Sequence, residues 1–116
     1  MRITRLYTGS DGESHFSEME LPLQDAGSKG LRSDVIEAMG IIFRETDESY
    51  ELEWHPASHR QFLFTLKGKV EIEVGDGTRR QFGPGDILLT EDTTGRGHIS
   101  RTVGDQSRLT AFVRLD

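Results

Sequence analysis

The residues best suited to chemistry lie between positions 54 and 68, which read WHPASHRQFLFTLKG. His55 and His59 are four residues apart, and Gln61 follows them just before an apolar run that ends in Lys-Gly. Imidazole nitrogens are the commonest metal ligands among side chains. The segment therefore indicates a metal site, a degenerate metal site, or a polar pocket that never holds a metal.

Short strands must position these side chains. Residues 50 to 55 alternate between apolar and polar types, which predicts a strand with Trp54 on one face and Glu53 and His55 on the other. Residues 61 to 66 (QFLFTL) are nearly all apolar, as in a strand that is buried on both faces. Turn signals containing glycine, proline and aspartate bound the remaining predicted strands. These cover residues 2–7, 15–23, 38–44, 69–74, 78–82, 87–90, 98–103 and 109–115.

Helix contributes little to this prediction. Residues 24 to 34 are polar and contain glycine, so they are predicted to form a loop, and Ser33 or Asp34 is expected to cap one short helical turn that ends at Glu37. Eight to ten short strands without a repeat or a linker predict a sandwich, a barrel or a jelly roll.

Composition narrows the classes of function. The 116 residues fit one domain with a core of its own, and the absence of cysteine excludes disulfides, zinc fingers and thiol nucleophiles. A net charge of -6 with scattered basic residues argues against a nucleic-acid partner. The start lacks the apolar segment of a signal peptide, and no later run is long enough to span a bilayer, so we expect no membrane association and a cytoplasmic location.

Two motifs give the chain a resemblance to the cupin superfamily, specifically to small single-domain bacterial cupins with a conserved barrel. His55 matches the first histidine of the first motif, and Gln61 stands at the glutamate position because Gly68 follows at the family's spacing. The stretch FGPGDILL (82–89) resembles the start of the second motif, and His98 resembles its histidine.

The resemblance implies an all-β double-stranded β-helix, the antiparallel cupin jelly-roll barrel with little helix. Residues 1–116 would form a single cupin domain, with N-terminal extension strands over 1–37 and the conserved barrel motifs over about 38–115. Cupins of this size commonly pair through edge strands and N-terminal segments, so the resemblance also implies a homodimer, with the strand from Arg2 to Tyr7 at the interface.

The chain departs from the family pattern at two of the four metal-ligand positions. A full cupin centre has three histidines and one glutamate, but here Ala57 occupies the second histidine position and Gln61 the glutamate position. His55, His98 and Gln61 are therefore the predicted ligands of a divalent ion such as Fe, Mn, Ni or Zn, which a neutral amide would hold more weakly than a carboxylate. His59 and Glu53 are the substitute ligands.

Without a metal, the same region forms a polar pocket. His55, Gln61, His98, His59 and Asp92 are its predicted lining, and Asp92 is placed to accept the second N–H of an imidazole. The candidate residues also have structural interpretations that involve no ligand. The histidines would form hydrogen bonds inside the barrel, and His59 would be exposed at a bend. Glu53 would be solvated, and Asp92 would build a turn.

Three functions remain open on the sequence. The first is binding of a small polar or anionic metabolite in the barrel pocket, without an intact three-His-one-Glu metal site. The second is a metal-dependent enzyme of the oxygenase or isomerase type, using His55 and His98 with a substitute ligand. The third is a structural dimer with a filled barrel. No motif for nucleophilic catalysis or nucleotide binding is present, and the residues do not decide whether the chain is an enzyme.

Overall fold

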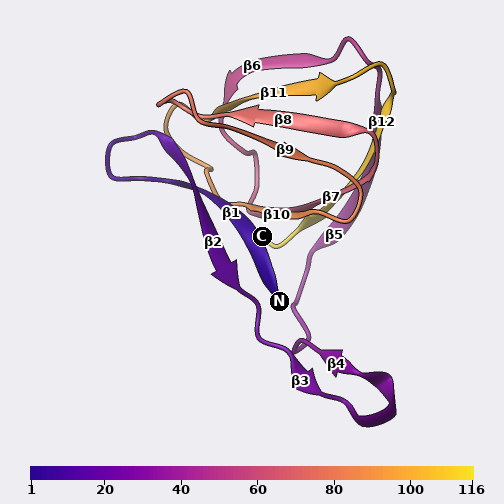
Figure 1. Cartoon of the computed structure of the whole chain (residues 1–116). Helices are drawn as coiled ribbons and strands as arrows, with labels where there is room; N and C mark the ends of the chain where they lie inside the picture. The colour runs from indigo at the N-terminus through magenta and orange to yellow at the C-terminus, as the bar shows by residue number, and fades with distance from the viewer.

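The computed structural model describes all residues from 1 to 116 and is almost entirely β-structure (Figure 1). Strands account for 54% of the chain and helix for 3%, which confirms the predicted all-β class. No helix is long and apolar enough to cross a membrane. The strands are β1 (Arg2–Thr8), β2 (Ser14–Glu20), β3 (Gln24–Asp25), β4 (Leu31–Arg32), β5 (Gly40–Thr46), β6 (Glu51–His55), β7 (Gln61–Lys67), β8 (Lys69–Glu73), β9 (Arg79–Phe82), β10 (Ile87–Thr90), β11 (His98–Val103) and β12 (Arg108–Arg114).

Two sheets face each other across the core. The first has six strands in the order β2-β1-β10-β7-β12-β5, and the second has four in the order β6-β11-β8-β9. Every pair within them is antiparallel except β1 with β10, which run parallel. The two sheets do not close into a continuous barrel. This arrangement is the predicted jelly roll, with one parallel pair in place of a fully antiparallel pattern.

The main apolar core fills one half of the space between the sheets. Its strands present every second residue inward, as a half-buried strand must. Residues of this cluster come from both sheets: Leu6, Leu63, Val70, Ile72, Val74, Phe82 and Leu88. The predicted two-sided burial of β7 is confirmed, because Leu63 faces this core while Phe62 packs with Ile3 and Leu89 in a second cluster on the opposite face. The other half of the space between the sheets remains open, and it holds the pocket.

The N-terminal strand is an internal strand and does not lie at an edge. β1 pairs with β2 on one side and with β10 on the other, and its Leu6 is fully buried. The expectation that residues 2 to 7 offer a free edge for pairing is therefore wrong. The free edges of the six-stranded sheet are β2 and β5.

Residues 24 to 37 differ from the expected loop and helical turn. β3 and β4 form a short hairpin around a 3-10 turn at Gly27–Lys29, and this hairpin projects away from the sheets (Figure 1). The expected helical turn from Ser33 to Glu37 is absent. A single turn with no buried face has no packing energy to offset its nucleation cost, and Val35 within it is 81% exposed.

Candidate functional site

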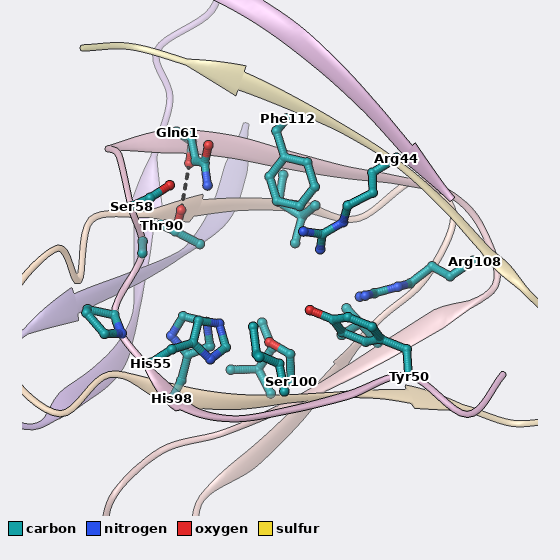
Figure 2. Close-up of a pocket in the computed structure, with 16 residues that line it drawn as sticks. Arg44, Tyr50, His55, Ser58, Gln61, Thr90, His98, Ser100, Arg108 and Phe112 are labelled. Carbon is teal, nitrogen blue, oxygen red and sulfur yellow. Dashed lines mark hydrogen bonds between the residues drawn. The ribbon is translucent and has the colours of Figure 1, made fainter. Parts of the chain in front are cut away.

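A cavity of about 260 Å³ lies between the two sheets, on the side of β5, β6 and β12. Figure 2 shows its polar side chains gathered at two ends, with His55 and His98 at one end and Arg44 and Arg108 at the other. Apolar side chains, among them Phe112, form the wall between these ends. The cavity therefore has two chemically different ends.

A β-bulge in β6 turns His55 toward the cavity. His55 pairs with His98 and Leu52 pairs with Ser100, so β6 advances three residues where β11 advances two. The extra residue reverses the alternation of the strand, and His55 lines the cavity together with Leu52 and Tyr50. The predicted separation of His55 from this apolar set is wrong, since it assumed an unbroken strand. Glu53 is exposed and lies outside the lining, and Trp54 packs under the guanidinium of Arg96, 3.7 Å from its ring centroid.

Gly97 brings the two histidines together. It has a φ of +81°, and a Cβ at this position would lie 2.0 Å from the carbonyl oxygen of His55. Only glycine combines this backbone conformation with so close an approach. The next residue, His98, consequently lies beside His55, with ring centroids 4.5 Å apart and ring planes tilted by 57°.

Both imidazoles are held through Nδ1. The His55 Nδ1 lies 2.6 Å from the carbonyl oxygen of Glu53, and the His98 Nδ1 lies 2.6 Å from Oδ2 of Asp92. A carbonyl and a carboxylate oxygen only accept hydrogen bonds, so both Nδ1 atoms carry a proton and donate it. In the neutral Nδ1–H form of an imidazole, Nε2 is an acceptor. The Nε2 atoms of His55 and His98 make no hydrogen bond within the protein.

Burial keeps His55 neutral. It lowers the pKa of the His55 imidazole below the ordinary value of 6.5, and the hydrogen bond to the Glu53 carbonyl opposes this change. Nearby His98 and Arg44 lower this pKa further, whereas the Asp92 carboxylate raises it. The net effect leaves His55 without charge at neutral pH.

Asp92 lies behind the cavity wall and is fully buried. Its Oδ2 accepts hydrogen bonds from His98 Nδ1 and from the Ser14 hydroxyl, both at 2.6 Å. This is the contact with an imidazole that the sequence suggested for Asp92. The residue thus acts through His98 and does not line the cavity.

Gln61 faces the cavity from β7. It pairs with Thr90 of β10, and both residues line the cavity. The Thr90 hydroxyl donates to the Gln61 backbone carbonyl at 3.1 Å, as drawn in Figure 2. His59 lies outside the lining, where its Nδ1 contacts the Ser58 hydroxyl at 3.0 Å. Three of the five predicted pocket residues, His55, Gln61 and His98, therefore line one cavity.

The sequence did not predict that Arg44 and Arg108 line one end of the cavity. Arg108 is only 2% exposed, its Nε donates to the Thr46 hydroxyl at 3.3 Å, and its Nη2 is buried without a partner. Its guanidinium lies 5.2 Å from the ring centroid of Tyr50, and that of Arg44 lies 5.6 Å from the same centroid. Burial and the charge of Arg44 lower the pKa of Arg108.

No carboxylate compensates these two arginines. The ion pairs of the chain involve other basic residues, and neither Arg44 nor Arg108 takes part in one. Buried charges in proteins are normally paired because desolvation without a partner is costly. The cavity therefore carries an excess of positive charge at this end.

The donor set does not fit the four-ligand metal centre of the cupin pattern. The cavity offers two imidazoles and the Gln61 amide, and no group of three or more His, Asp or Glu side chains is arranged around one point. Two neutral nitrogens and an amide oxygen supply no negative charge to a divalent ion.

Comparisons with solved structures agree with this fold. A cupin 2 conserved barrel domain protein from Salinispora arenicola CNS-205 is 19% identical, with a TM-score of 0.55 over 72% of this chain and 67% of that one. Protein NMB1881 from Neisseria meningitidis is 17% identical, with a TM-score of 0.51 over 72% of this chain and 81% of that one. No protein-family model and no curated protein matches the sequence.

The chain thus has a cupin-like fold, as its motifs predicted. Identities below 20% show the common fold and leave the function to be argued from the site itself.

Proposed function

We propose that this protein binds a small polar or anionic metabolite in the cavity between its two sheets. The observation that carries the proposal is Arg108, whose buried Nη2 has no partner and whose charge has no carboxylate nearby. A bound ligand that accepts a hydrogen bond from Arg108 would remove the cost of this unsatisfied group, which is about 1–3 kcal/mol or more for a charged donor. The cavity of about 260 Å³ suits a small molecule.

A metabolite screen tests this proposal. Thermal unfolding is followed in the presence of a panel of anionic, neutral and cationic metabolites, and each hit is mapped by amide chemical-shift changes. We expect stabilising hits whose shift changes cluster on the strands that line the cavity, β5, β6, β7, β8, β10, β11 and β12. A panel without hits, or hits that map to other surfaces, would refute the proposal.

The second candidate function is a metal-dependent enzyme of the oxygenase or isomerase type. The two free Nε2 atoms on adjacent imidazoles favour it, with His55 and His98 as ligands and Gln61 as the third donor. Elemental analysis of untagged protein tests it. Near-stoichiometric Fe, Mn, Ni or Zn that is lost in both His55→Ala and His98→Ala supports this function, whereas protein that stays metal-free after each ion is added excludes it.

We also propose that the chain forms a homodimer, with β5 at the interface. β5 is a seven-residue edge strand, and Ile41 and Phe43 on it are 54% and 67% exposed. Long apolar edge strands are normally covered, because they otherwise promote aggregation. Light scattering tests the proposal, and a species of 13.1 kDa at micromolar concentration would contradict it.

A further inference from the structure

The two ends of the cavity differ in hydrogen-bonding character. At one end, the guanidinium groups of Arg44 and Arg108 only donate hydrogen bonds, and Figure 2 shows both reaching into the cavity beside the Tyr50 hydroxyl. At the other end, the Nδ1 atoms of His55 and His98 are occupied by hydrogen bonds to the Glu53 carbonyl and to Asp92, so each ring offers a ligand only its Nε2. A ligand that spans the cavity must therefore accept hydrogen bonds at the arginine end and bond to Nε2 at the histidine end.

The arginine end selects for an anion. Arg108 is buried with a free Nη2, and Arg44 adds a second positive charge that no acidic side chain neutralises. Guanidinium groups pair with carboxylates in planar, charge-assisted geometry. A carboxylate matches the planar geometry and the charge of this end.

The histidine end selects for a neutral polar group. The two Nε2 atoms have no partner in the protein, and a hydroxyl group can form a hydrogen bond with one of them. An ammonium group is a poorer match, because it adds positive charge to a cavity that already holds the unpaired guanidinium groups of Arg44 and Arg108. A hydroxyl forms a hydrogen bond without adding that charge.

We propose that the ligand is a small hydroxycarboxylic acid, with its carboxylate on Arg44 and Arg108 and its hydroxyl on the Nε2 atoms of His55 and His98. This assignment rests on the proposed binding function and specifies the chemical class of the ligand. A hydroxy acid with a short carbon chain fits within a cavity of about 260 Å³, with its apolar middle against Phe112 and Leu63.

Matched ligands provide the test. Isothermal titration calorimetry compares short straight-chain hydroxy acids, for example 2-, 3- and 4-hydroxybutyrate, with butyrate, 2-aminobutyrate and 1,3-butanediol. We expect the best hydroxy acid to bind at least about tenfold more tightly than butyrate, since an unmet polar group at either end costs a factor of this order. The diol and the amino acid should bind more weakly still.

Two arginine variants and one control test whether the arginine end binds the carboxylate. Arg44→Met removes a charge from a residue that is already exposed at the edge of the sheet, so the fold should survive. Arg108→Lys keeps the buried charge but loses the planar fork. Arg32→Met, in the projecting hairpin, is the matched control. We expect Arg44→Met and Arg108→Lys each to weaken hydroxy acid binding by about tenfold or more and Arg32→Met to leave it unchanged.

The outcomes distinguish this inference from the function on which it rests. Equal binding of butyrate and the hydroxy acids, equal binding of the diol, or no effect of Arg44→Met would overturn the hydroxy acid assignment. If a neutral or cationic metabolite from the wider panel maps to the cavity instead, the binding function stands and the assignment fails. If no compound in either panel binds, both fail.

Discussion

The Asp92→Asn variant tests most directly whether Asp92 holds His98 in place at the cavity. Asp92 is fully buried, and its Oδ2 accepts two 2.6 Å hydrogen bonds, from Ser14 and His98. Hydrogen bonds to a charged group contribute about 1.5–3 kcal/mol each, and an asparagine oxygen retains them at a neutral strength of about 1 kcal/mol. The difference for the two bonds is about 1–4 kcal/mol, and the lower desolvation cost of a neutral amide offsets part of it.

We therefore expect Asp92→Asn to lower the free energy of unfolding by about 2 kcal/mol, which corresponds to a fall in Tm of roughly 8 °C for a domain of this size. Urea denaturation followed by circular dichroism measures the first quantity. Ser14→Ala should cost a similar amount, because it removes outright one hydrogen bond to a charged group, worth about 1.5–3 kcal/mol. The two variants should be non-additive, since they share one carboxylate.

The same variant should change the tautomer of His98. The asparagine oxygen is a weaker acceptor than the carboxylate, so it holds the proton on Nδ1 less strongly and part of the population moves it to Nε2. Long-range ¹H–¹⁵N correlation of the imidazole reports this directly. The matched control is Asp34→Asn, because Asp34 is exposed and its carboxylate makes no hydrogen bond. Unchanged unfolding together with an unchanged His98 tautomer would refute the reasoning.

Three further perturbations follow from the fold. Gly97→Ala should destabilise the protein by more than about 3 kcal/mol and broaden the His55 resonances, because its Cβ would overlap the His55 carbonyl; a variant with normal stability would contradict this contact. Glu91→Gln should cost about 1 kcal/mol near pH 7, because Glu91 accepts from two arginines that are partly exposed. These hydrogen bonds outweigh burial and lower the pKa of Glu91, so the cost should be present above the ordinary carboxyl value of 4.5 and vanish as pH falls through the lowered value; a cost that stays constant in acid would count against it. Phe43→Glu should convert a dimer to monomers in light scattering while the Tm of the monomer changes little, and an unchanged dimer would exclude β5 from the interface.

The strands could be predicted because their alternation is a local property. β7 and β8 were recognisable from QFLFTL and KVEIE, since two-sided and one-sided burial leave different patterns in the sequence. His98 could be placed near His55 only through the resemblance to a known motif. Nothing in the 42 residues between them states that they pair.

The orientation of β6 could not be predicted, because a bulge is a property of two strands and their pairing. The extra residue between Leu52 and His55 is visible only when β11 lies alongside. The arginine end was missed for a related reason. β5 is apolar on both faces, so its alternation does not show that Arg44 lines the cavity. Arg108 and Phe112 are four residues apart in one strand, so they point to the same face. This spacing was the only feature of the sequence that could have placed Arg108 in the cavity.

The position of Trp54 gives the molecule an intrinsic optical reporter. It is the only tryptophan of the chain, it directly precedes His55, and Arg96 lies over its indole. Arg96 belongs to the loop that leads into His98, so the two partners of this stack are tied to the two histidines of the cavity. A change in the spacing of those histidines will move a cation relative to a fluorophore and alter its emission. Events at the histidine end can thus be followed in unlabelled protein, on the timescale of a stopped-flow mixing experiment.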